Sequence, residues 1–389
     1  MSTTFGANDD RLAPLAQALP VGWNERNARL IEQYGNASRE PFRAVSVGGL
    51  DPRRSPITAE ELSSKTVQEM VSILDSWRES DRFHGPSYEG LVDTFKNVVS
   101  EDPTRFLESW AAFKPISPRY FHALLLGLRE ALKKNWQDEW WTETLAACQW
   151  ATEQPGALTG GDSDTEDKQE PTWTWVARTI LDLLSAGFEE SDHAIRLDHR
   201  DQAWKLLVSV TTHPDPTPEI EAKEHEQSNM DYLTSSLNCV RGQALHAVIR
   251  HALWLRCRWA ESDDHKELIS HGFDAMPEVR DVLEHHLDST ADGSLAVRAV
   301  YGQWFPWLCL LDPRWTAEHA DTIFADENQH ESMWTAAWSS YISYCPAYND
   351  VFHILRSFYA KAVEELPECE GDEDHIRDPA HRLAEHIMI

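Results

Sequence analysis

The residues of this sequence that could do acid–base or metal chemistry are, first of all, its 18 histidines. A zinc protease of the His-Glu-x-x-His type needs two imidazoles on one helix face, with the glutamate as general base. His225-Glu226 and His330-Glu331 both lack the second histidine. No histidine is followed by aspartate, so the sequence also lacks the central pair of the His-Asp phosphohydrolases.

Four residues near the C-terminus, His375, His381, Glu385 and His386, could gather around a metal ion. Histidines with acidic neighbours at the end of a chain are more often part of a solvated helix. We therefore predict no metal site. A metal-dependent hydrolase built from scattered His, Asp and Glu residues stays an alternative.

One further pattern has the letters of a nuclease centre. Pro214-Asp215 followed by Glu221-Ala222-Lys223 matches PD-(D/E)xK, in which two carboxylates hold magnesium and a lysine steadies the nucleophile. That chemistry normally lies on adjacent strands, whereas the alternating prolines 214, 216 and 218 indicate a turn. We interpret the match as accidental.

Nucleotide and acyl-transfer motifs are missing too. No glycine is followed by lysine, which excludes a P-loop, and neither Gly-x-Ser-x-Gly nor Gly-x-Gly-x-x-Gly occurs. The sequence therefore predicts no enzyme, no catalytic residue and no cofactor.

Composition narrows the classes of partner. The 389 residues include 65 acidic and 35 basic ones, a formal charge of −30. This excess opposes direct binding to phosphate backbones and to anionic membranes. With 41% hydrophobic residues and 17 tryptophans, the chain is expected to be folded rather than disordered. An acidic inhibitor that mimics nucleic acid is an alternative that fits the same charge.

Cysteine usage and the sequence ends favour a reduced, cytoplasmic protein. The six cysteines form no Cys-x-x-Cys pair, and the first ten residues contain neither a basic nor an apolar signal region. No apolar run approaches the roughly 20 residues that a membrane helix needs. We expect no membrane partner.

The pattern of apolar residues predicts helices almost throughout. Residues 237–259 carry apolar side chains at three- and four-residue steps on a wide face, which is typical of a helix inside a multi-helix pack. Asp-Pro pairs that suit helix starts occur at Asp51, Asp102, Asp215, Asp312 and Asp378. Strand and hairpin signals are scarce. We predict an all-α chain, arranged as a HEAT-like α-solenoid or, alternatively, as a compact multi-helix domain.

Two acidic stretches divide the chain. Residues 156–171 combine glycine and charge without an apolar period and indicate a flexible linker, while 214–228 is expected to join helices of one array. The predicted organisation is an N-terminal helical region over 1–155, the linker 156–171, a helical-repeat region over 172–366, and an acidic tail over 367–389 with a short helix.

Pro306 lies inside a helical pattern over 295–311, where its ring should clash with the carbonyl of Gly302. A kink is expected there, with Tyr301, Trp304, Phe305 and Trp307 around it. We interpret the kink as wrapping the helix round a core rather than as a ligand site.

Several phrases together resemble a known group of proteins. They are residues 55–62 (SPITAEEL), 100–106 (SEDPTRF), 120–128 (YFHALLLGL), 237–244 (LNCVRGQA) and 296–307 (AVRAVYGQWFPW). The chain resembles the C-terminal helical-repeat regions of large bacterial NTPases of the STAND type, a group that includes antiphage defence proteins. The resemblance spans most of residues 25–365 and implies a sensing or scaffolding role. The NTPase part of that family has no counterpart here.

These observations lead to one function hypothesis. We expect a non-enzymatic helical-repeat module that recognises or scaffolds another protein, such as a separate NTPase or effector subunit, in a bacterial defence system. Polar residues that flank apolar helix faces are the candidate partner-binding residues: Arg241, Gln243, Arg298, Tyr301 and Gln303. Buried hydrogen bonds between helices are the alternative role for each.

Overall fold

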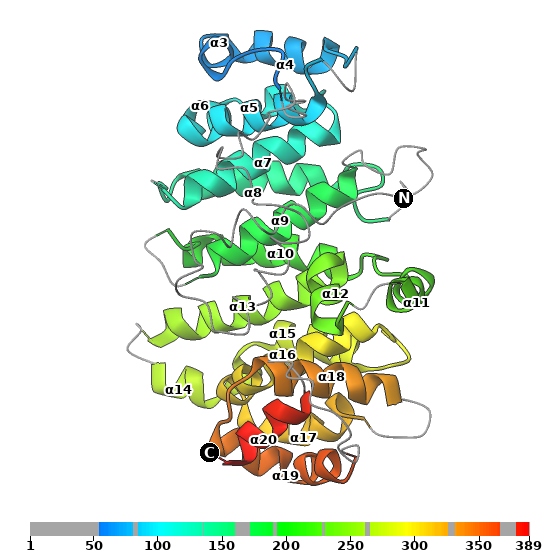
Figure 1. Cartoon of the computed structure of the whole chain (residues 1–389). Coiled ribbons are helices and arrows are strands. Elements are labelled where there is room, and N and C mark those ends of the chain that lie inside the picture. The colour runs from blue at the N-terminus through cyan, green and yellow to red at the C-terminus, as the bar shows by residue number, and fades with distance from the viewer. Residues whose placement is uncertain are drawn as a thin grey trace, which may run out of the picture. The chain divides into compact units, whose positions relative to one another are not determined.

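The computed structural model describes residues 54–80, 85–134, 136–159, 172–189, 193–227, 230–260, 265–325, 331–365 and 379–388. Within these ranges all regular structure is helical and no strand occurs, which confirms the all-α prediction (Figure 1). All of these residues belong to one compact unit.

The first half of the described chain contains α3 (Ala59–Ser63), α4 (Val67–Ser76), α5 (Tyr88–Glu101), α6 (Pro103–Glu108), α7 (Pro118–Leu132), α8 (Trp140–Thr152), α9 (Trp173–Gly187), α10 (Arg200–Thr211) and α11 (Pro218–Gln227). The second half contains α12 (Tyr232–Asn238), α13 (Val240–Ala260), α14 (His265–Ser270), α15 (Pro277–Leu287), α16 (Leu295–Leu311), α17 (Pro313–Ile323), α18 (Glu331–Tyr344), α19 (Asn349–Glu364) and α20 (Pro379–Met388). Short 3-10 turns lie at Trp110–Phe113, Leu197–His199 and Gly272–Ala275.

Side-chain caps fix many of the helix starts. Asp102 and Asp312 each accept a backbone N–H from the first turn of α6 and α17, with proline at the first helical position, as the Asp-Pro pattern predicts. Asp215 acts differently, because no helix begins at the next residue. Its carboxylate accepts the backbone N–H of Val240, the first residue of α13 (2.8 Å). Asp51 and Asp378 lie outside the described residues.

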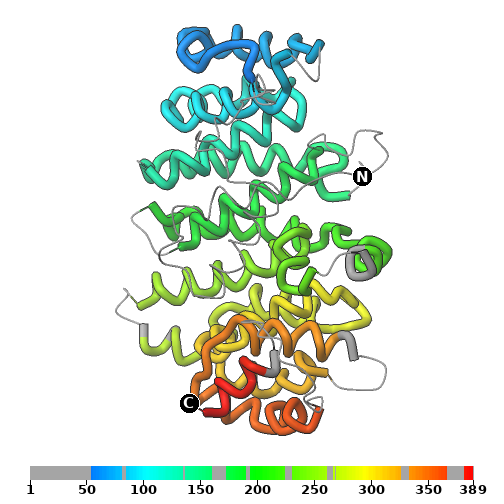
Figure 2. The backbone as a smooth tube through the Cα atoms, viewed as in Figure 1, coloured from blue at the N-terminus to red at the C-terminus, as the bar shows by residue number. Residues whose placement is uncertain are grey.

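A row of long helices forms the centre of this unit. Helices α5, α7, α9, α13, α16 and α18 each pack against the next one in the row, as Figures 1 and 2 show. A second set, α6, α8 and α10, packs in the same order, and α10 also contacts α13. One continuous hydrophobic core runs through these contacts, from Leu62 to Leu383. Helices on both sides of the stretch 156–171 contribute to this core, since α7 packs against α9. Residues 160–171 of that stretch lie outside the described residues.

Two local predictions need correction. The stretch 214–228 was expected to be a connecting loop, but α11 occupies Pro218–Gln227. The Thr217 hydroxyl accepts the Ile220 N–H (3.3 Å) and so caps the helix, and Pro218 occupies its first position. Both features favour a helix start at this point. The helix predicted over 237–259 is divided, since α12 ends at Asn238 and α13 begins at Val240.

Helix α16 runs through Pro306 without interruption. The packing of α16 against α18 explains why residue 302 is glycine. A Cβ atom placed there would lie 2.0 Å from the carbonyl oxygen of Ala337 in α18. The close approach of two helix backbones therefore requires this glycine.

Candidate functional site

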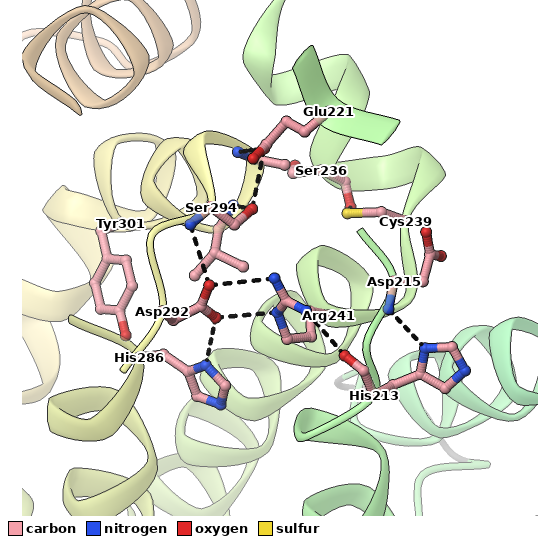
Figure 3. Close-up of polar contacts among 12 residues, drawn as sticks. His213, Asp215, Glu221, Ser236, Cys239, Arg241, His286, Asp292, Ser294 and Tyr301 are labelled. Atoms are coloured by element: carbon pink, nitrogen blue, oxygen red, sulfur yellow. Dashed lines mark hydrogen bonds and ion pairs between the residues drawn. The ribbon is translucent and has the colours of Figure 1, made fainter. Parts of the chain in front are cut away.

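A largely buried polar network joins three regions of the chain. Arg241, at the start of α13, donates from Nε and Nη2 to the two carboxylate oxygens of Asp292 (3.1 and 3.2 Å) and from Nη1 to the carbonyl of His213 (3.0 Å). Asp292 lies in the loop before α16, and His213 follows α10 (Figure 3). The bidentate ion pair connects α13 with the α15–α16 region, and the hydrogen bond to His213 adds the α10–α11 region.

Asp292 has further partners that keep it charged. Nδ1 of His286, near the end of α15, and the backbone N–H of Ser294 also donate to its carboxylate (2.7 and 3.1 Å). Burial alone would raise the pKa of Asp292, but the hydrogen bond from His286, the Arg241 charge and the Ser294 amide outweigh burial and lower the pKa. Because these donors enclose the carboxylate and the site is buried, the network connects helices rather than receiving a substrate.

Arg298 and Tyr301 make helix-to-helix contacts in the interior. The Arg298 guanidinium donates to the carbonyls of Thr322 (2.9 Å) and Leu287 (2.8 Å), and the Tyr301 hydroxyl donates to the carbonyl of Leu283 (2.6 Å). Both side chains are buried. For these two residues the structure has the buried hydrogen bonds that were the alternative to partner binding.

The two predicted glutamines lie outside this network. Gln243 donates from Nε2 to the carbonyl of Leu237 (2.6 Å). The side-chain oxygens of Gln243 and Gln303 are buried and accept no hydrogen bond among the described residues. The structure thus does not bring the five predicted residues to one surface.

Asp215 and Glu221 of the nuclease-like pattern have separate structural partners. Asp215 pairs with Arg178 (2.9 Å), besides capping α13. Glu221 accepts the backbone N–H of Ala296 (2.6 Å) and the hydroxyl of Ser294 (3.0 Å), and so binds the start of α16 (Figure 3). Each carboxylate therefore has protein partners of its own, at a helix start or an arginine.

Metal ligands do not assemble in the described part of the chain, where no group of three His, Cys, Asp or Glu side chains has metal-binding geometry. His386 hydrogen-bonds with the Tyr359 hydroxyl through Nδ1 (2.7 Å) and with the Cys345 carbonyl through Nε2 (2.9 Å). His381 lies beside Glu385, and His375 is outside the described residues.

No described helix has the length and apolarity to cross a bilayer.

A pocket on the surface of the row α9, α13 and α16 is the best candidate for a binding site. It has a volume of about 280 Å³. Its lining comes from the end of α9, the C-terminal half of α13 and the middle of α16: Phe188, Glu189, Arg250, Leu253, Trp254, Cys257, Arg258, Trp304 and Trp307. We call these nine residues the α13 groove.

The aromatic residues of the α13 groove are held by the protein interior. The indole N–H of Trp304 donates to Nδ1 of His246 (2.7 Å), and that of Trp254 donates to the Ile195 carbonyl (3.0 Å). Trp307 is different, because 46% of it is exposed. Leu310, one helical turn further along α16, is 45% exposed and extends the apolar strip beyond the pocket.

Charge is distributed unevenly around the groove. The guanidinium of Arg250 lies 5.5 Å from the centre of the Trp304 ring and 3.3 Å from a carboxylate oxygen of Glu189. Helix α13 contains four arginines and no carboxylate, and α16 contains one arginine and no carboxylate. The charged residues that line the groove are Arg250 and Arg258 from α13 and Glu189 from the end of α9.

Sequence reasoning did not find this site, although part of its signal was visible. Trp304 and Trp307 are three residues apart beside the expected kink, a spacing that puts both on one helix face. The sequence pattern around Pro306 favours a role in core packing for both residues. The contribution of Phe188 and Glu189 depends on how α9 packs against α13, which no local pattern reveals.

Two buried histidines behind the groove differ in their hydrogen bonds. His246 has partners at both nitrogens, Trp304 and the Ser236 hydroxyl (2.8 Å), whereas neither ring nitrogen of His251 has a hydrogen-bond partner among the residues that the structure describes. The His251 ring packs among aromatic rings, with the Trp204 ring centre 4.9 Å away. Burial lowers the pKa of each histidine to about 3, so both are neutral in the folded protein.

We expect His251→Leu to stabilise the protein by about 1 kcal/mol, because it removes two buried polar atoms that lack partners. His246→Leu is the matched control, and it should cost about 2 kcal/mol because it leaves the Trp304 N–H unpaired. Urea unfolding at neutral pH measures both changes. A destabilised His251→Leu variant would show that the imidazole contributes favourably.

The same histidines predict acid sensitivity. Their folded pKa values lie below the usual 6.5, so the stability linked to their neutral forms is full above about pH 6.5 and is lost as the pH falls toward 3. Unfolding free energy should therefore decrease below about pH 6.5 in the wild type. His251→Leu should show a shallower decrease.

Comparison with known proteins adds no relative. No family model matches the chain, no curated protein matches it, and no solved structure matches it. The resemblance to STAND-type repeat regions therefore rests on the sequence phrases alone.

Proposed function

We propose that this chain is a non-enzymatic helical module that recognises another protein, and that the α13 groove is its docking surface. The observation that carries the proposal is the exposure of Trp307 and Leu310 beside a pocket formed by three successive helices. Large aromatic residues at a concave, partly apolar site are typical of the centres of protein interfaces. The order of helix packing favours the HEAT-like arrangement, in which successive helices build an extended binding face.

The biological setting belongs to the same proposal. A sensing or scaffolding component of a bacterial defence system is what the STAND-like phrases imply, with a separate NTPase or effector subunit as the partner. Within the described residues, the polar clusters at Asp292 and Arg298 are enclosed by protein donors and acceptors, which suits a binding module better than a catalyst.

The proposal predicts that Trp307→Ala together with Leu310→Ala abolishes partner capture. Immobilised wild-type and variant proteins would be incubated with lysate of the native cells, and bound proteins quantified by mass spectrometry. Trp175→Ala is the control, because Trp175 is 44% exposed but lies at the other end of α9, about 20 Å from Phe188 along the helix.

Proteins that are retained by the wild type and by Trp175→Ala, lost with the double variant, and bound again when purified would support the docking surface. Circular dichroism would verify that the double variant is folded. If the folded double variant retained every captured protein, the α13 groove would not be the docking surface.

A further inference from the structure

The chemistry of the α13 groove points to the kind of segment that it binds. Of the five arginines on α13 and α16, Arg241 and Arg298 are committed to buried partners. Arg250 lines the groove, where it forms an exposed ion pair with Glu189. An arginine at the edge of an apolar pocket is complementary to a carboxylate of a bound segment.

The pocket itself is suited to one large apolar side chain. Its volume of about 280 Å³ lies just below the range of small-molecule sites, which begins at about 300 Å³, and most of its lining is aromatic or aliphatic. The rings of Trp304 and Trp307 are 6.4 Å apart but inclined by 53°. A flat base therefore finds no parallel pair of rings between which to stack, and a leucine or aromatic side chain fits the shape better.

The Arg250–Glu189 pair indicates where a carboxylate of the partner would bind. The two side chains are 3.3 Å apart and 37% and 61% exposed. An ion pair so open to water is weak, so an incoming carboxylate can replace Glu189 at little cost. Glu189 thus occupies, from the protein's own chain, the position that a ligand carboxylate would take.

We infer that the α13 groove binds an acidic peptide segment of a partner protein, with one large apolar side chain in the pocket and a neighbouring carboxylate on Arg250. This inference rests on the proposed function and specifies the chemistry of the partner. It assigns Trp304 and Trp307 to the apolar anchor, and Arg250 to the neighbouring carboxylate.

A displayed library of random peptides, selected on the full chain, provides the probe. The expected consensus is a leucine or aromatic residue with Asp or Glu within two positions. Binding of the labelled consensus peptide would then be measured by fluorescence anisotropy. Arg250→Gln and Trp307→Ala should each weaken binding about tenfold. Added salt should weaken it as well.

Glu189→Gln gives the sharpest test, because the expected change has the opposite sign. Removing the competing carboxylate should tighten peptide binding about threefold. Asp182→Asn, on the same helix α9, is the matched control: it removes one negative charge that pairs with Arg129 instead, and should leave binding unchanged. Weaker binding by Glu189→Gln would overturn the inference.

Other occupants would give different results. Basic or neutral consensus peptides whose binding depends on Trp307 would overturn the acidic assignment but leave the docking surface intact. A labelled single-stranded oligonucleotide that binds in a Trp307-dependent way would assign the groove to nucleic acid. A dimeric chain that becomes monomeric on Trp307→Ala would assign it to a second copy. A library without any Trp307-dependent peptide would overturn the inference, and the lysate experiment would then decide the proposed function separately.

Discussion

Replacing Gly302 by alanine is expected to destabilise the protein by about 3 kcal/mol. A Cβ atom on Gly302 would lie 2.0 Å from the carbonyl oxygen of Ala337 and less than 3 Å from two further backbone atoms of that residue. Backbone atoms in the middle of α18 cannot rotate away as a side chain could, so α16 and α18 would have to separate. The gain in helix propensity from glycine to alanine, about 1 kcal/mol, is too small to compensate.

Gly293→Ala is the matched control, because the nearest atom to its added Cβ would be the Ser289 carbonyl oxygen at an ordinary 3.7 Å. Its change in unfolding free energy should stay within about 0.5 kcal/mol. Urea titrations followed by circular dichroism would compare both variants with the wild type. Equal unfolding midpoints for Gly302→Ala and the wild type would contradict the close packing of α16 on α18.

Asp292→Ala is expected to cost about 3 kcal/mol, because it leaves the Arg241 guanidinium, only 15% exposed, without its anion. It also removes the acceptor of His286 and of the Ser294 N–H. Since the pKa of Asp292 is lowered in the folded protein, its stabilising contribution is full above about pH 3.8 and is lost as the pH falls through the lower folded pKa. At neutral pH the whole effect should be visible.

Asp182→Ala is a matched control for this prediction. Asp182 also accepts two hydrogen bonds from one arginine, Arg129, at 2.8 and 3.4 Å, but half of its side chain is exposed. Its removal should cost at most about 1 kcal/mol. Thermal and urea unfolding of both variants would separate buried from exposed pairs. Similar losses for Asp292→Ala and Asp182→Ala would mean that the Arg241 network is open to water.

The helices themselves could be predicted from the sequence because their signals are local. The apolar face over 240–259, the caps at Asp102 and Asp312, and the proline that follows each cap depend on residues within one or two turns. Asp215 shows the limit of such signals. It has the same Asp-Pro pair, yet its carboxylate caps α13, which begins 25 residues later.

Contacts between distant parts of the chain could not be predicted in the same way. Asp292, the partner of Arg241, is 51 residues away from it. Gly302 must be glycine because it packs against Ala337, which is 35 positions further along the chain. The α13 groove combines the end of α9 with faces of α13 and α16, so its lining exists only after the helices have packed. The flanking polar residues that attracted notice, Arg298 and Tyr301 among them, bind backbone carbonyls in the interior.

Site-specific photo-crosslinking at position 307 tests the docking surface most directly. A benzophenone amino acid would replace Trp307 in one protein and Trp175 in another, and each would be irradiated in the native cells. We expect one defined partner to be crosslinked from position 307 and not from position 175, with the attachment site in a contiguous partner segment. Equal crosslinking from both positions, or none from position 307 in a folded protein, would contradict recognition through the α13 groove.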